Sequence, residues 1–130
     1  MGTCQICERE IKHKKGLIAH HGYKRPGQGW QTDSCAGAKN LPYEKSRDLI
    51  PKVIEFIKIF IRKTENEIQN IKLKNLPVPN ILLKDKFIES TNPSYKIRQE
   101  EHINRLEYQI KSAIKEKERL IKRYENWNLH

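Results

Sequence analysis

The chain has 130 residues and a formal net charge of +10, from 26 lysines and arginines against 16 acidic residues, with 36% hydrophobic residues. This length suits one domain, or a small module with an extension, and excludes large cofactor-dependent enzymes. Three cysteines are too few for a secreted disulfide scaffold, and the densest apolar stretch, Leu49–Ile61, is too short and too often interrupted by charge to span a membrane.

The N-terminal residues show no targeting signal. They lack the apolar run of a secretory peptide, and Ile6 stands where a myristoylation signal has Ser or Thr. We therefore expect a cytoplasmic protein without membrane contact, whose cysteines are thiols or metal ligands in a reducing compartment.

The glycine and cysteine distribution marks a boundary near residue 41. All six glycines and all three cysteines lie within residues 1–40, and no glycine follows Gly37. We predict a mostly α-helical protein with a small zinc-binding module over residues 1–41. A long, coiled-coil-like antiparallel helical hairpin is expected over residues 42–130.

The N-terminal module carries a ligand set for one structural Zn²⁺ per chain. Cys4 and Cys7 have the two-residue gap with which a tight turn offers two thiolates to one tetrahedral ion, and a His-His pair follows after twelve residues. This half resembles a C2H2 finger, but Lys24, Arg25 and Pro26 occupy the positions of its second histidine. The remaining candidate is Cys35, so the predicted ligands are Cys4, Cys7, Cys35 and one of His20 and His21. The alternatives are a redox CxxC or unrelated thiols.

Basic and aromatic residues accompany the metal ligands. The glycine-rich loop over residues 20–32 brings Tyr23 and Trp30 near Lys24 and Arg25, a combination that suits phosphate contact and base stacking. A second basic cluster includes Lys12, Lys14 and Lys15. Under the alternative reading, Tyr23 and Trp30 form the small core of the module and the charges are merely solvated.

A longer motif extends through the same region. Its matching positions are Cys4 and Cys7, His20 to Tyr23, Arg25 to Gly27, Gly29 to Thr32, Ser34-Cys35 and Gly37-Ala38. The chain here resembles small, uncharacterised bacterial and phage zinc-finger proteins with CxxC followed by HHGYxRPGxGWQTxSCxGA. The resemblance covers the first third of the chain. It implies a zinc module and a bacterial or phage-infected host cell, but no mechanism.

The rest of the chain predicts helices. Asn40-Leu41-Pro42 suggests a helix start, giving a short helix near 42–49 before a long one from about Ile50 to Lys74. The long helix has a heptad seam in which only Thr64 is polar. The seam consists of Ile50, Ile54, Ile57, Ile61, Thr64, Ile68 and Ile71.

A connection at residues 76–94 separates the two long helices. Pro77 and Pro79 end the first helix, and Asn92 or Ser94 can cap the second, which we predict over Tyr95–Asn126. The connection is too apolar for a free linker, so we expect it to pack on the helices, with a short helical turn as one form. The second seam consists of Ile103, Leu106, Ile110, Ala113, Lys117, Leu120, Tyr124 and Trp127.

One helix face is wider than a single seam requires. Nine of the thirteen residues in Leu49–Ile61 are apolar. The excess must be covered by the zinc module, by the connection or by another subunit, and we predict homo-oligomerisation through this face.

Three functional classes fit these features. The basic charge favours a nucleic-acid-binding or regulatory protein with a helical oligomerisation stalk. The alternative is an adaptor or inhibitor that docks on a host protein, since zinc modules do both. A less favoured reading is an HNH-like nuclease using His20, His21 and Asn40. No catalytic residues are recognisable, so we expect a protein that is not an enzyme.

Overall fold

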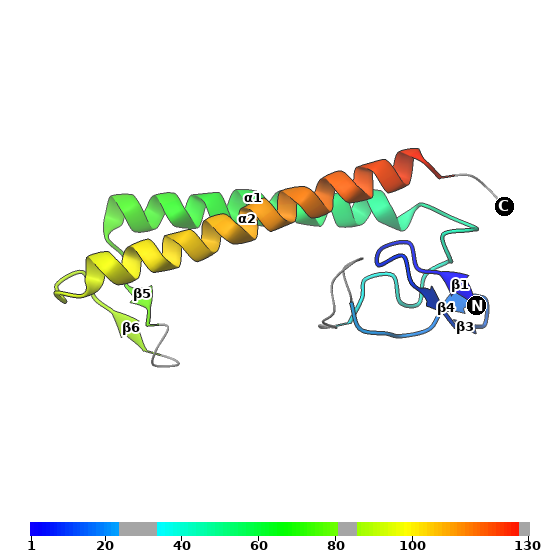
Figure 1. Cartoon of the computed structure of the whole chain (residues 1–130), viewed down its shortest axis with the longest axis horizontal. Helices are drawn as coiled ribbons and strands as arrows, with labels where there is room; N and C mark the ends of the chain where they lie inside the picture. The colour runs from blue at the N-terminus through cyan, green and yellow to red at the C-terminus, as the bar shows by residue number, and fades with distance from the viewer. Residues whose placement is uncertain (24–33, 81–85, 128–130) are drawn as a thin grey trace. The chain divides into compact units, whose positions relative to one another are not determined.

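The computed structural model describes residues 1–23, 34–80 and 86–127, which form two long helices and three pairs of short antiparallel strands (Figure 1). The chain divides into two compact units, Met1–Phe56 with Lys117–His130, and Ile57–Glu116. Each long helix therefore contributes residues to both units.

The first unit begins with two strand pairs. Strand β1 (Gly2–Thr3) pairs with β2 (Glu10–Ile11), and β3 (His13–Lys14) pairs with β4 (Leu17–Ile18). Lys15 and Gly16 link β3 to β4 with φ values of 56° and 79°. Positive φ at both central residues is typical of a type I′ turn, which joins two strands through a two-residue loop.

We expected a short helix over residues 42–49, and this prediction is wrong because the segment forms turns. The Tyr43 N–H donates to the Thr3 carbonyl at 2.7 Å, and the Glu44 carboxylate accepts the Thr3 N–H at 2.8 and 3.0 Å. These bonds tie the segment to β1. The Tyr43 N–H and the Glu44 carboxylate therefore have partners without a regular helix.

Helix α1 spans Leu49–Lys74, close to the predicted range. The Leu49 N–H donates to the side-chain oxygen of Gln5 at 3.0 Å, so a residue of the turn that carries Cys4 and Cys7 caps the helix start. Asn75, with φ of 49°, ends the helix in the left-handed conformation that Asn tolerates well.

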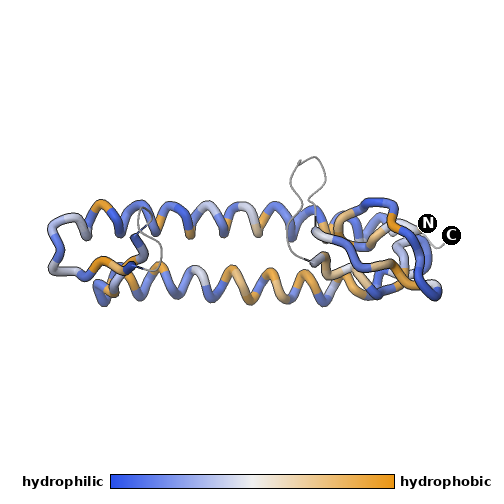
Figure 2. The backbone as a smooth tube through the Cα atoms, turned by 90° about the horizontal axis from the view of Figure 1, so that it is seen from below, coloured by the Kyte–Doolittle hydropathy of each residue, from blue (hydrophilic) through white to orange (hydrophobic). Residues whose placement is uncertain are grey.

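The predicted seam of α1 is largely buried, with Ile57 half-buried. The Thr64 hydroxyl is satisfied within the helix because it donates to the Phe60 carbonyl at 2.8 Å. Hydrophobic positions recur along the helix with hydrophilic ones between them (Figure 2). The buried seam residues are Ile50, Ile54, Ile61, Thr64, Ile68 and Ile71.

Helix α2 spans Tyr95–Glu125, one residue shorter than predicted. The Asn92 side chain accepts the Ser94 N–H at 2.8 Å immediately before the helix begins. In its predicted seam, Ile103, Leu106 and Leu120 are buried and the remaining positions are half-buried.

The second unit has a small apolar core that includes part of the connection. Strand β5 (Val78–Pro79) pairs with β6 (Phe87–Ile88), so the described part of the connection forms strands and not the helical turn that its sequence allows. Pro79 explains this because it has no amide hydrogen and interrupts a helix. Val78 and Ile88 join the helices in one cluster with Ile68, Ile71, Tyr95, Ile103 and Leu106.

Polar contacts in this unit run in opposite order along the two helices. The Gln99 side chain donates to the Ile71 carbonyl at 3.3 Å, and His102 Nε2 lies 3.6 Å from Glu67 Oε1. His102 is buried, and Arg105 donates to its Nδ1 at 2.9 Å. Nδ1 is therefore the acceptor, and the ring hydrogen sits on Nε2 facing the Glu67 carboxylate.

Burial and the Arg105 charge hold the pKa of His102 below its usual value, which Glu67 offsets only in part. The unfolded chain thus binds this proton more readily, so the free energy of unfolding should fall as pH drops below about 6.5. We expect denaturant titrations to show that the free energy of unfolding falls more between pH 7 and pH 5 in the wild type than in His102→Gln. The difference should be at most about 1.4 kcal/mol per pH unit. His13→Gln, at an exposed histidine, is the control. Equal pH slopes for the wild type and His102→Gln would contradict the prediction.

Candidate metal centre

Cys4 and Cys7 lie on a tight turn that joins β1 to β2. The Cys4 N–H donates to the Arg9 carbonyl at 2.9 Å, which closes the turn, and the Ile6 N–H points at the Cys4 sulfur at 3.4 Å. Glu8, directly after Cys7, has φ of 66°, which lets the chain reverse. We call residues 4–8 the cysteine turn. It presents two sulfurs on one side and leaves backbone carbonyls on its outside.

His21 and Cys35 are brought together by backbone pairing. Gly22 and Ser34 form an isolated antiparallel bridge, and the Cys35 N–H donates to the His21 carbonyl at 2.9 Å. Residues fourteen positions apart thereby face the cysteine turn side by side.

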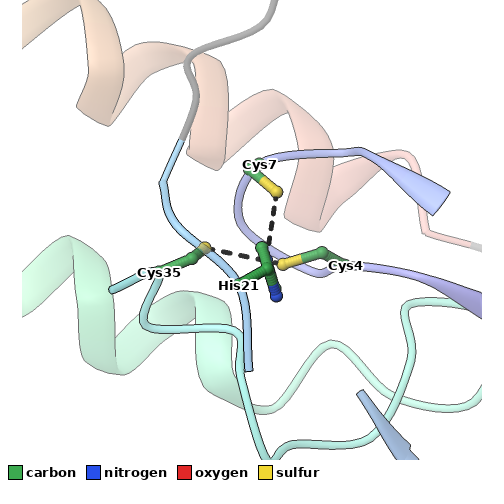
Figure 3. Close-up of side chains that lie close together, drawn as sticks. All are labelled: Cys4, Cys7, His21 and Cys35. Atoms are coloured by element: carbon green, nitrogen blue, oxygen red, sulfur yellow. Dashed lines mark hydrogen bonds between the residues drawn. The ribbon is translucent and has the colours of Figure 1, made fainter. Parts of the chain in front are cut away.

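The four side chains converge on one point (Figure 3). Their candidate ligand atoms, the sulfurs of Cys4, Cys7 and Cys35 and a ring nitrogen of His21, all lie within 4.8 Å of one another. The Cys7 sulfur is 3.4 Å from His21 Nε2, and the sulfurs of Cys4 and Cys35 are 3.7 Å apart. The cysteines are 0–3% exposed, so their side chains are shielded from solvent, whereas His21 is half-buried. This is a candidate metal site of three thiols and one imidazole.

The structure distinguishes the two adjacent histidines. His21 Nδ1 lies 2.8 Å from the Ala19 carbonyl, so it carries the ring hydrogen and leaves the Nε2 lone pair directed into the cluster. Metal-binding histidines usually donate their second nitrogen in this way, which fixes the tautomer. His20 Nε2 instead lies 2.7 Å from the Ser34 hydroxyl at the exposed surface. Of the two candidates, His21 is the one placed to bind a metal.

The three thiols perturb one another. Hydrogen bonds from the Cys35 and Cys4 side chains hold the pKa of the Cys7 thiol below its ordinary value. Hydrogen bonds with the Cys4 and Cys7 side chains raise the pKa of the Cys35 thiol, and burial raises it further. Such a cluster suits a divalent cation, which replaces thiol protons and binds the thiolates directly.

Gly37 contributes to the site, although sequence analysis did not assign it a role. A Cβ at this position would lie 2.1 Å from the Cys4 sulfur and 3.7 Å from the Cys35 sulfur. Real side chains do not approach a sulfur at 2.1 Å, so only glycine fits beside these two ligands. Its signal in the sequence is its position two residues after Cys35.

The predicted contact residues that the structure describes lie outside the cluster. Lys12, Lys14 and Lys15 are exposed on and beside the β3–β4 hairpin, and Tyr23 is half-buried. Lys24, Arg25 and Trp30 lie outside the described residues. Asn40, considered as a nuclease residue, donates its amide to the carbonyls of Ala38 at 2.9 Å and Ala36 at 3.2 Å. That side chain therefore shapes the turn after Cys35.

No family model, curated protein or solved structure matches this chain. None of the described helices combines the length and the hydropathy needed to cross a bilayer. Four protein side chains are the number that bind the metal in a closed, tetrahedral structural site, whereas catalytic sites usually keep one position for water or substrate.

Proposed function

We propose that Cys4, Cys7, His21 and Cys35 bind one structural Zn²⁺ that holds the N-terminal module together. The convergence of three buried sulfurs and one Nε2 within 4.8 Å carries this proposal. Three thiolates and an imidazole suit zinc, and a module built from two-residue strands has little core of its own to fold it. Free thiols in such a site fit the cytoplasm of a bacterial or phage-infected cell.

We further propose that this module makes the protein a nucleic-acid-binding or regulatory factor. Lys12, Lys14 and Lys15 are exposed around a two-residue hairpin turn, and none of the three is ion-paired with a carboxylate of the described residues. Residues 1–40 contain seven lysines and arginines against three acids. Lysines exposed at a short hairpin can approach phosphates and neutralise them.

A salt titration tests the nucleic-acid proposal. The triple variant Lys12→Ala, Lys14→Ala, Lys15→Ala should lower the slope of log affinity against log salt by up to about 0.9 for each duplex phosphate that the protein no longer neutralises. The measurement is fluorescence anisotropy with duplex DNA, single-stranded DNA and RNA probes. The control variant Lys52→Ala, Lys63→Ala, Lys111→Ala removes the same charge from exposed helix positions. Equal reductions of the slope in the two variants would show diffuse attraction without a hairpin site.

Wild-type binding weaker than about 100 μM to all three probes would be no better than nonspecific attraction, and would favour an adaptor or inhibitor of a host protein.

One observation independently favours a protein contact. Phe56, Ile59 and Phe60 of α1 are 72%, 39% and 43% exposed within one predicted apolar face. We propose that α1 and α2 of each chain pair as an antiparallel hairpin, and that a second copy of the chain covers this apolar face.

Phe56→Glu is expected to shift the protein from oligomer to monomer at micromolar concentration, because it places a charge in the apolar contact. Light scattering or native mass spectrometry measures the change. Leu73→Glu is the matched control, since Leu73 is 79% exposed on the same helix but lies outside the face. A monomeric wild type, or equal effects of the two substitutions, would overturn this part of the proposal.

A further inference from the structure

The outer side of the cysteine turn is bound by two arginines from the end of α2. Arg123 donates from Nη2 to the Cys4 carbonyl at 2.9 Å and from Nε to the Gln5 carbonyl at 2.8 Å. Arg119 donates from Nη2 to the Ile6 carbonyl at 2.7 Å. Three successive carbonyls, which the strand pairing leaves without partners, are therefore satisfied by side chains more than 110 positions away.

The same guanidinium groups are themselves held in place. Glu8, the last residue of the cysteine turn, forms ion pairs with Arg119 and, at 3.3 Å, with Arg123. The Tyr43 ring stacks on the Arg123 guanidinium at 3.6 Å, and the Arg123 side chain is only 11% exposed. A cation held this rigidly loses little entropy when it binds the turn.

The segment before α1 also fastens the end of α2. The Tyr43 hydroxyl donates to the Arg123 carbonyl, and Arg47 donates to the Tyr124 carbonyl at 2.9 Å while stacking on the Tyr124 ring at 4.0 Å. The Trp127 indole N–H donates back to the Tyr43 carbonyl. The bonds from Tyr43 and Arg47 satisfy the carbonyls of Arg123 and Tyr124 in the last turn of the helix. Within this unit, the end of α2 is therefore bound both to the segment before α1 and, through its arginines, to the cysteine turn.

We infer that Arg119 and Arg123 are positioning residues of the metal centre. They act by fixing the backbone that carries Cys4 and Cys7 in its metal-binding conformation. They also offset charge, because a Zn²⁺ with three thiolates and a neutral imidazole has a net charge of −1. This inference rests on the proposed zinc site. By linkage, if docking of the α2 end on the cysteine turn tightens zinc binding by a given factor, then zinc binding must favour that docking by the same factor.

The first test is competition for zinc between the full-length protein and a chelating dye of known affinity. We expect Arg123→Ala and Arg119→Ala to weaken zinc binding about 10- to 100-fold, the range found when partners behind metal ligands are removed. Arg123→Lys keeps the charge but cannot make both carbonyl contacts, so a loss close to that of Arg123→Ala assigns the effect to geometry. Lys122→Ala, an exposed cation in the same helical turn, is the control and should bind as the wild type does.

The second test uses the wild type alone and so does not depend on how the variants fold. Chelation of the metal should speed amide hydrogen exchange over residues 120–125 at least about 10-fold, while residues 103–106 of the second unit exchange at an unchanged rate. If the wild type binds no zinc, the proposed site fails. If the wild type binds zinc but the arginine variants retain it equally, or exchange over residues 120–125 is unaffected by chelation, the site stands and this inference fails.

Discussion

We expect the wild type to bind one equivalent of zinc, His21→Ala to lose it and His20→Ala to keep it. The two residues are adjacent and chemically identical, so composition and net charge change equally in the two variants. Only His21 directs Nε2 at the thiols, with Nδ1 bound to the Ala19 carbonyl. His20 Nε2 is instead engaged with the Ser34 hydroxyl, and removing that exposed hydrogen bond leaves the ligand set intact.

Elemental analysis of protein purified without chelators measures this difference directly. Cobalt substitution adds an independent readout, because a tetrahedral site with three thiolates gives visible absorption that weakens when a ligand is removed. Circular dichroism should show most helicity retained in His21→Ala, since the second unit contains none of the four ligands. Full zinc content in His21→Ala, or its loss in His20→Ala alone, would show that the ligand assignment is wrong.

Cys4 and Cys7 were predictable because their two-residue gap is a local property, and Cys35 followed by elimination as the one cysteine left. The choice between His20 and His21 is different. It depends on the Gly22–Ser34 bridge, a pairing across twelve residues that no periodicity encodes. Gly37 and the two arginines were missed for the same reason, since their partners lie far away in the chain. Arginines in a charged helix look like solvated surface until the carbonyls they bind are known.

The long helices were predictable because their seams repeat over many residues and strong end signals flank them. Helix α1 ends at Lys74, shortly before Pro77, as predicted. The short helix near residues 42–49 failed because the pairing of Tyr43 and Glu44 with Thr3 outweighs the local Asn-Leu-Pro start signal. Tertiary hydrogen bonds generally override propensity in so short a segment, where few helical bonds could form in compensation.

Gly37→Ala is expected to remove metal binding as effectively as the loss of a ligand. The added methyl would stand 2.1 Å from the Cys4 sulfur, well inside van der Waals contact, and the sulfur cannot retreat because Cys4 is fully buried. Either the turn after Cys35 or the cysteine turn must move. Either movement separates the ligand atoms. In a tetrahedral site with zinc–sulfur distances of about 2.3 Å, these atoms must lie within about 4 Å of one another.

Gly16→Ala provides the matched control for that prediction, because it adds the same methyl to another glycine of the module. Apart from its chain neighbours, no atom of the described residues lies within 4 Å of a Cβ at this position, so the expected penalty comes from the backbone, with φ of 79°. We expect a stability loss of about 1 to 2 kcal/mol, with the full equivalent of zinc retained. Zinc content by elemental analysis and cobalt absorption separate the two outcomes. Normal metal binding by Gly37→Ala would mean that Cys4 and the turn after Cys35 are further apart when the ion is bound, and that the fit around Gly37 is not a requirement of the site.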